Sequence, residues 1–419
     1  MHLGRHEVVV TGMGAVTPYG IGTEPLWRGL SEGQSAIGWI ESSGDLDADL
    51  YPVRYGAEVK RFSVDDQLRR HCEVRDEKSV QLGMVAAQHA LRQASLLDEA
   101  DHVPDASRNL SVIVGSGHGP CNEVAICYGA FFQRGPRAVR PTSVPKGMYN
   151  SLSCNLSIYF GVTGANEVIA TACASGTAAI GHALILIRHG YADIVLCGGA
   201  DAPITRPTLT GWTNMRVLAR HVDPQKASRP FDAKRNGMVL GEGAAMIVLE
   251  SRESAERRGV QPLARVLGYG TSSDAHHLTS PTVAGQVAAM RNCLADAHYS
   301  PEQVDYLNLH GTATKANDET EANAVVEVFG PRGERMPASS TKSMLGHALG
   351  ASGALEFVIC VAALQNQFVP PTINCDEPDP NVGLDYVPHV GRSHPVRVAL
   401  SNSFAFGGNN ACIMIGTCK

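Results

Sequence analysis

The chain alternates short runs rich in β-branched residues with longer helical segments, and this alternation limits its fold more than any other feature. Short apolar runs are typical of buried strands, and longer amphipathic runs are typical of helices. Strands are expected at 7–11, 110–115, 167–172, 192–197, 244–250, 264–269, 305–309, 337–340, 396–400 and 411–415. Helices are expected at 78–93, 177–189, 285–297, 319–329 and 353–365. This order predicts an α/β fold with largely buried sheets.

A polar helical segment at 252–258 separates two parts with a similar order of elements. Each part opens with a strand, continues through a central strand–helix unit and closes with a pair of strands. The letters show no repeat and no low-complexity linker, so we expect two halves, 1–255 and 256–419, packed as one body. A chain of 419 residues, 44% of them hydrophobic, is long enough to bury such a core.

Composition argues against several classes of protein. A net charge of −6 offers no general attraction for nucleic acid or an anionic membrane. No run of about 18 uncharged apolar residues predicts a transmembrane helix. The N-terminus lacks the pattern of a signal peptide, and the 11 cysteines include no C-x-x-C pair, which predicts reduced thiols and a cytoplasmic location.

Two glycine clusters follow predicted strands, Gly12-Met-Gly14 and Gly115-Ser-Gly-His-Gly119. A dinucleotide-binding fingerprint needs a third glycine, but Thr17 and Pro120 stand at that position. Tight turns therefore explain both clusters better than a nucleotide site does.

Cys173 stands where a buried-strand pattern runs into an apolar helical segment. Free N–H groups and the helix dipole at such a turn favour an anion, which predicts a lowered pKa for the Cys173 thiol. The neighbouring Ala and Gly residues leave room for a substrate. On this local sequence alone, the alternative is that Cys173 is a buried structural cysteine. We interpret the other cysteines in that way.

Two histidines, His310 and His347, each stand on a turn rich in Gly or Thr. The first ends a predicted strand, and the second lies in a glycine-punctuated loop that leads into a helix. A lone histidine is more often a satisfied core or surface group than a catalyst. Two histidines placed in this way indicate a site.

Several segments together resemble the signature blocks of β-ketoacyl-acyl-carrier-protein synthases I/II. These segments are Thr171-Ala-Cys-Ala-Ser-Gly176, Ser228-Arg-Pro-Phe-Asp232, Val239-Leu-Gly-Glu-Gly243, His310-Gly-Thr-Ala-Thr314, Lys342-Ser-Met-Leu-Gly-His347 and Asn402-Ser-Phe-Ala-Phe-Gly-Gly408. The resemblance covers nearly the whole chain in order. It implies the thiolase-like fold, in which two similar βαβαβαββ halves form five layers, αβαβα.

The resemblance also implies a reaction. Cys173 accepts an acyl chain from the 4'-phosphopantetheine of a carrier protein, malonyl-carrier protein loses CO2, and the resulting enolate attacks the acyl-cysteine. His310 and His347 are expected to stabilise the enolate by hydrogen bonds. The protein itself is expected to carry no cofactor and no metal.

Lys342 matches a family lysine and is expected to hold Glu356 in an orienting pair, which is close to a purely structural ion pair. Thr312 and Thr314 match residues expected to bind the pantetheine arm. Their alternative role is to cap the following helix.

Backbone N–H groups of Cys173 and Phe406 are expected to form the oxyanion hole of the family. The gating loop around Phe406 usually reads Gly-Phe-Gly-Gly-Thr-Asn, but here it reads Ala405-Phe-Gly407-Gly-Asn409-Asn. Alanine resists backbone angles that glycine permits, so we expect Phe406 to move differently.

The predicted acyl pocket also departs from ordinary fatty-acid elongation enzymes. His118 stands where the family commonly has an aliphatic residue, and Thr142 and Ser143 stand where aromatic residues are common. Polar lining weakens the preference for a saturated chain. A specialised acyl substrate, polyunsaturated or oxygenated, is therefore predicted, since similar loops occur in type II polyketide and aryl-polyene pathways. Ordinary fatty-acid elongation is the alternative.

The partner predicted from the resemblance is an acidic acyl carrier protein, which needs a basic rim. Candidates for this rim are Arg69, Arg70 and Arg75, with Arg134, Arg137 and Arg140 as a second set. A dimer is also expected, with either a second copy or a chain-length-factor-like subunit.

Two other classes compete with a condensing enzyme. Thiolases use a second cysteine in a C-terminal glycine-rich turn, but this chain has Phe406-Gly-Gly-Asn-Asn410 there and Cys412 in an apolar strand. Non-catalytic chain-length factors lack the nucleophile, so Cys173 with both histidines argues against that class.

Overall fold

The structure is a computed structural model that describes residues 6–44, 46–69, 77–381 and 383–418. Its first half follows the order β1 (Val8–Thr17), α2 (Lys78–Gln93), β5 (Ser111–Gly115), α5 (Ser151–Phe160), β6 (Asn166–Ile169), α6 (Ser175–Arg188), β7 (Ile194–Asp201) and β8 (Gly243–Ser251). The second half follows β9 (Ala264–Ser273), α9 (Val283–Ala297), β10 (Tyr306–Asn308), α10 (Lys315–Phe329), β11 (Ala338–Ser339), α12 (Ser352–Asn366), β14 (Val398–Ala405) and β15 (Asn409–Gly416). Both halves therefore read βαβαβαββ, as expected.

The spatial order of the strands repeats as well. The first half is ordered β6-β5-β7-β8-β1 and the second β11-β10-β14-β15-β9. When the strands of each half are numbered in chain order, both halves have the spatial order 3-2-4-5-1. This shared order shows an internal duplication that is not visible in the sequence. The two sets meet where β1 pairs antiparallel with β9, Val9 opposite Arg265 and Val10 opposite Ala264.

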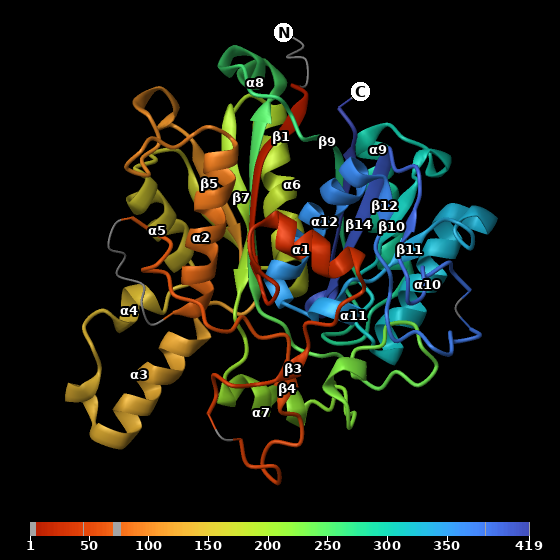
Figure 1. Cartoon of the computed structure of the whole chain (residues 1–419), viewed down its shortest axis with the longest axis horizontal. Coiled ribbons are helices and arrows are strands. Elements are labelled where there is room, and N and C mark those ends of the chain that lie inside the picture. The colour runs from red at the N-terminus through yellow and green to blue at the C-terminus, as the bar shows by residue number, and fades with distance from the viewer. Residues whose placement is uncertain (1–5, 45, 70–76, 382, 419) are drawn as a thin grey trace.

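Helices cover the strands in layers (Figure 1). Helix α2 packs on β1, β7 and β8, and α9 packs on β9 and β15 with α10 beside it. Between the two sets of strands lie α6 and α12, which contact each other and strands of both halves. These contacts confirm the predicted five-layered αβαβα fold. The proposed boundary at 255/256 falls within α8 (Arg252–Arg258), which links the two halves.

Helices α6 and α12 are apolar on most sides because most of their residues are buried. Residues Leu349–Asn366, which include α12, have the length and composition of a membrane span, but 89% of this segment is buried inside the fold. It is therefore the core helix of a globular body. The functional residues cluster where α6 and α12 begin.

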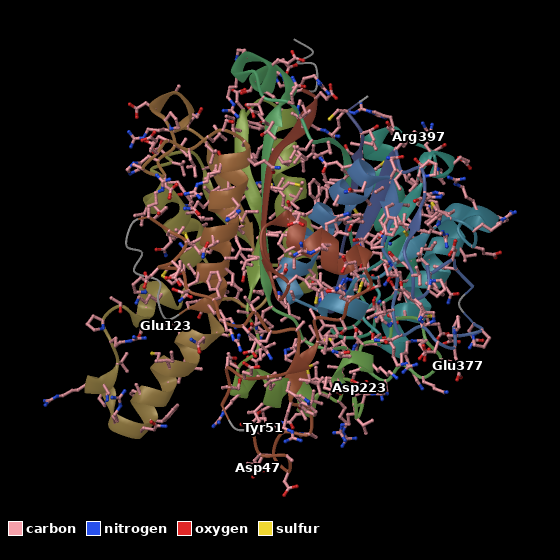
Figure 2. All side chains as sticks on the ribbon, in the orientation of Figure 1. Asp47, Tyr51, Glu123, Asp223, Glu377 and Arg397 are labelled. Carbon is pink, nitrogen blue, oxygen red and sulfur yellow. The ribbon has the colours of Figure 1, made fainter. Side chains whose placement is uncertain are left out.

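Further elements decorate this body. They are β2 (Gly20–Ile21), α1 (Thr23–Ser31), β3 (Gly38–Trp39), β4 (Tyr55–Gly56), α3 (Cys121–Arg134), α4 (Ser143–Lys146), α7 (Arg206–Asn214), α11 (Lys342–Leu345), β12 (Phe368–Val369) and β13 (Arg392–Ser393). Helices α3 and α4 project from the first half (Figure 1). At the root of α3 the buried Glu123 carboxylate lies 2.8 Å from Arg140 (Figure 2).

Candidate active site

Cys173 sits in a tight turn between β6 and α6. The preceding residue, Ala172, has φ +50°, a left-handed conformation that costs an L-residue about 1–2 kcal/mol. The Ser175 hydroxyl offsets this strain, because it accepts from the Thr171 N–H at 2.9 Å and donates to the Ala172 carbonyl at 2.6 Å. The strained turn holds the thiol at the end of the helix.

Burial controls the chemistry of this thiol. It raises the pKa of Cys173 to about 12, although the Lys342 ammonium and the N–H groups of Phe406 and Cys173 lower it, and the Asp201 carboxylate adds to the rise. The prediction that the helix end gives a net lowering of the thiol pKa is therefore wrong. The desolvation of the thiolate outweighs the helix-end N–H groups. A reaction at this sulfur must move its proton.

The backbone N–H groups of Cys173 and Phe406 lie close enough to the Cys173 sulfur to lower its pKa. They are the two groups expected to form an oxyanion hole, and they converge at the nucleophile from α6 and from the end of β14. Such fixed donors can stabilise a developing negative charge without reorganisation.

His310 and His347 face each other in the same site. Their ring centroids lie 5.3 Å apart and the ring planes meet at 84°. Burial, with Lys342 nearby, holds the pKa of both imidazoles well below the ordinary value, so both are neutral. His310 Nδ1 and His347 Nε2 are buried without a hydrogen-bond partner, whereas His347 Nδ1 lies 2.9 Å from Ser352 Oγ. A neutral imidazole with a free nitrogen can serve a substrate oxygen.

Behind the histidines, the Lys342 ammonium donates to the Glu356 carboxylate, and each side chain is 3% exposed. Burial raises the pKa of Glu356 to about 7, although Lys342 opposes the rise. Glu356 Oε2 has no hydrogen-bond partner. The expected pair is therefore present and leaves one carboxylate oxygen free.

Cys173, His310, His347 and Phe406 surround one cavity of ≈ 60 Å³, called here the catalytic cavity. Its lining includes Cys173, Trp212, Met238, Leu278, His310, Thr312, Thr314, His347, Phe404, Ala405 and Phe406. The Thr312 and Thr314 hydroxyls lie 2.9 Å apart, and Thr314 also accepts from the Asn317 N–H and so caps α10. The capping role is therefore observed for Thr314, and pantetheine binding stays a prediction for both threonines.

The loop around Phe406 is shaped by its glycines rather than by Ala405. Ala405 is extended, with φ −122° and ψ 156°, and is unstrained. Gly407 has φ +82°, which a side chain would resist, and its N–H donates to the Leu278 carbonyl at 2.7 Å. The Phe406 ring stacks on Trp212 with centroids 5.8 Å apart.

Trp212 also belongs to a second, larger cavity of ≈ 950 Å³, called here the side pocket. Its lining includes His118, Pro120, Cys121, Val124, Tyr128, Gly147, Tyr149, Thr208, Trp212 and Met215. His118 lines this pocket, and its role in holding the acyl chain stays a prediction. Among the described residues, Thr142 and Ser143 do not line this pocket: Thr142 is exposed and Ser143 is buried at the start of α4, whose far end presents Gly147 to the pocket.

The arginines expected at the carrier rim are scattered. Arg70 and Arg75 lie outside the described residues. Arg69 is exposed and donates to the Glu99 carbonyl, and it does not line the catalytic cavity. Arg134 and Arg137 are exposed on and beside α3, and they line neither the catalytic cavity nor the side pocket.

Asp201 is a buried residue of the site that the sequence did not predict. The Asp201 carboxylate, at the end of β7, accepts from Ser116 Oγ at 2.8 Å and from the N–H groups of Gly117, His118 and Gly350 at 2.9, 3.3 and 2.7 Å. A Cβ on Gly350 would lie 2.2 Å from the Gly117 nitrogen, so only glycine permits this crossing. Asp201 thus ties the loop of His118 to the loop of His347. The only sequence signal was a polar residue at the end of a buried strand.

Other sites are not indicated. Cys412 is fully buried in β15 and does not line the catalytic cavity, so it does not act as a thiolase-type second cysteine. Within the described ranges, no group of three or more His, Cys, Asp or Glu side chains is arranged to hold a metal ion.

Comparisons with known proteins agree with this geometry. The model of the β-ketoacyl synthase N-terminal domain matches residues 5–255 and that of the C-terminal domain matches residues 263–376. The chain is 40% identical to a 3-oxoacyl-[acyl-carrier-protein] synthase 2 of Synechocystis sp., covering 98% of both chains. It is 42% identical to nodulation protein E of a Rhizobium species, over 97% of this chain and 98% of that one. The ishigamide ketosynthase/chain length factor structure superposes with a TM-score of 0.90 at 35% identity, covering 99% of this chain and all of that one. The chain therefore belongs to the β-ketoacyl synthase family.

Proposed function

We propose that this protein condenses an acyl group held on Cys173 with malonyl-acyl-carrier protein to give β-ketoacyl-acyl-carrier protein. The observation that carries this proposal is the single cavity shared by Cys173, His310 and His347, with two oxyanion donors at the sulfur. A relative named 3-oxoacyl-[acyl-carrier-protein] synthase 2 supports it. A chain-length-factor role is not favoured, because the nucleophile and both histidines are in place.

In the first step, the Cys173 sulfur attacks the carrier-bound thioester. The carbonyl oxygen gains negative charge, which the N–H groups of Cys173 and Phe406 stabilise. The bond to the carrier sulfur breaks, and the Cys173 proton leaves with the carrier thiol. The high thiol pKa is compatible with this step because a neutral histidine beside the sulfur can relay the proton.

In the second step, the malonyl thioester loses its carboxylate as CO2 and becomes an enolate. His310 and His347 both line the catalytic cavity, so their neutral imidazoles can donate to the enolate oxygen. Neutral donors suit this role, because a protonated imidazole would give its proton to the enolate and quench it. The α-carbon then attacks the acyl carbon, and the bonding pair returns to the Cys173 sulfur.

Mass spectrometry tests this function directly. Incubation with an acyl-carrier protein should add one acyl mass to the peptide that contains Cys173, and malonyl-carrier protein should then release CO2. A protein that gains no acyl mass and releases no CO2 would contradict the proposal.

We further propose that the acyl chain occupies the side pocket beyond Phe406 and is a specialised, unsaturated or oxygenated chain. The pocket walls include His118, Tyr149 and Trp212, which offer π faces and polar edges. A saturated chain gains about 0.8 kcal/mol for each methylene that it buries in an apolar pocket, and polar groups in the wall reduce this gain.

Replacing His118 by leucine should therefore shift selectivity toward saturated chains. We expect the ratio of acylation rates, saturated over polyenoyl, to rise several-fold in H118L, as measured with matched acyl-carrier proteins. Wild-type protein that uses saturated chains equally well or better would contradict the specialised substrate and leave ordinary fatty-acid elongation.

We propose that an acidic acyl carrier protein docks at the mouth of the catalytic cavity. Arg216 directly precedes the lining residue Val217, and Lys315 directly precedes the lining residue Ala316; both side chains are exposed. They join Arg69, Arg70 and Arg75 as candidates. Exposed pairs are worth about 0.2–1 kcal/mol each, so the effect of each charge reversal is modest.

Charge reversal at the mouth should raise the KM for the carrier. R216E and K315E are each expected to raise it by about threefold with kcat unchanged. Arg397 is the control, because it is an exposed arginine that lines neither the catalytic cavity nor the side pocket. An unchanged KM in R216E and K315E, with a rise in R69E/R70E, would move the docking site to the segment before α2.

The proposed assembly is a dimer with a second copy or a chain-length-factor-like subunit, in the cytoplasm. The flank around α3–α6 exposes Phe132, Val144 and Ile158 to 80%, 73% and 79%, beside the edge strand β6. Such a surface favours burial against a subunit. Native mass spectrometry of the protein co-expressed with its operon neighbours distinguishes the two assemblies.

A further inference from the structure

A small cavity lies behind the catalytic residues, away from the substrate side. Its volume is ≈ 10 Å³, and its lining includes Glu242, Thr341, Lys342, Ser352 and Glu356, all of them buried. A cavity holds one water molecule from about 10–15 Å³ upward, provided that two to four polar partners are present. The small cavity is at this threshold and has the partners.

One of these partners is otherwise unsatisfied. Glu356 is 2% exposed, and its Oε2 has no hydrogen-bond partner while its other oxygen accepts from Lys342. A buried carboxylate oxygen left without a donor is costly, and ordered water is the usual remedy. The free oxygen and the small cavity therefore point to the same ligand.

The small cavity connects on one side to the surface. Glu242 lies 2.6 Å from the Lys78 ammonium, which is 25% exposed, and it also accepts from the Val59 N–H. Lys78 and Val59 line an outer pocket of ≈ 450 Å³. Burial raises the pKa of Glu242, and Lys78 opposes the rise, so this carboxyl can exchange a proton more readily than an exposed one at neutral pH.

On the other side the small cavity connects to the catalytic residues. Ser352 lines it, and the Ser352 hydroxyl lies 2.9 Å from His347 Nδ1. His347 also lines the catalytic cavity, as does Cys173, and its Nε2 has no hydrogen-bond partner. A continuous set of exchangeable groups thus runs from Lys78 through Glu242, the cavity and Ser352 to His347.

The proposed reaction needs such a route. In acyl transfer the thiol proton leaves with the carrier thiol, so no net proton is required. In condensation the carboxylate leaves as CO2, the new C–C bond forms, the acyl C–S bond breaks, and the electron pair stays on sulfur. The pKa of about 12 means that this thiolate must take up one proton from solvent in each cycle. During this step the substrate arm occupies the catalytic cavity.

We propose, on the basis of the function above, that the small cavity binds a water molecule that delivers this proton from Glu242 through Ser352 and His347 to Cys173. Glu242 is then a positioning and relay residue that does not touch the substrate. The route enters from the face of the outer pocket and stays open while a carrier protein covers the mouth.

Glu242→Gln tests the route, because glutamine keeps the shape and the acceptor for Val59 but cannot carry the proton. We expect the single-turnover rate of Cys173 acylation to be unchanged, kcat for condensation to fall on the order of 10-fold, and the solvent deuterium isotope effect on kcat to rise. Thr341→Val, which removes a polar group from the small cavity, should change the same quantities in the same direction.

Glu250→Gln is the matched control. Glu242 directly precedes β8, and Glu250 is the penultimate residue of that strand. Glu250 is likewise a buried carboxylate paired with a cation, Arg258, at 2.8 Å. E250Q should lower stability but leave the ratio of condensation to acylation unchanged. If E242Q lowers both rates equally, or leaves kcat and the isotope effect at wild-type values, the route is refuted. Absence of acylation in the wild-type protein would instead overturn the proposed function.

Discussion

Replacing Cys173 with alanine is expected to abolish acyl loading and to lower condensation by more than about 10⁴-fold, because no other group in the cavity can carry the acyl chain. Decarboxylation of malonyl-carrier protein should persist in C173A. That step requires donors to the enolate oxygen, and His310 and His347 remain in place. Acyl mass on the protein and CO2 release measure the two activities separately.

The reverse pattern should appear in H310A and H347A, which keep the nucleophile and lose enolate donors. They are expected to accept the acyl chain and to release little CO2. If C173A lost decarboxylation as fully as the histidine variants do, the assignment of acyl loading to the sulfur and of decarboxylation to the imidazoles would be refuted.

The second large effect concerns the Lys342–Glu356 pair. Glu356→Ala leaves the Lys342 ammonium buried without its counter-ion, which is expected to lower the free energy of unfolding by about 3–5 kcal/mol. Thermal or denaturant unfolding measures this loss. Condensation per folded molecule should also fall, because Lys342 loses the carboxylate that orients it. The Lys342 charge acts on Cys173, His310 and His347.

A double variant separates the structural effect from the catalytic one. Replacing both partners by apolar residues, as in K342M/E356L, removes the unpaired charge and should recover most of the lost stability. Condensation should stay low, since the charge near the sulfur is gone. Recovery of activity together with stability would show that the pair is only structural.

Much of the fold was readable from the sequence because each strand is a continuous apolar run and each core helix is long. The predicted strand at 110–115 is β5 (Ser111–Gly115), and the predicted helix at 78–93 is α2 (Lys78–Gln93). The strand at 396–400 extends further, as β14 (Val398–Ala405), because Asn402 and Ser403 read as polar but are buried in the interior of the fold. The projecting helix α3 was not predicted, since its apolar residues are exposed rather than on a core face.

The candidate site was also only partly predictable from the sequence. Motif residues such as Cys173, His310 and His347 could be named from their turns and their family resemblance. The raised pKa of Cys173 could not, because it depends on desolvation by segments distant in the chain. Asp201 and the route through Glu242 depend on contacts between residues more than 80 positions apart, and no local pattern encodes them.

The buried pair of central helices also bears on how the chain reaches its native state. Helix α6 cannot exclude water until α12, more than 150 residues later, packs against it. Either half alone would present an apolar helix to solvent, so folding must wait for distant segments to meet. We therefore expect slow refolding with a strong tendency to aggregate before the halves dock, and we expect that separately expressed halves will need one another to stay in solution.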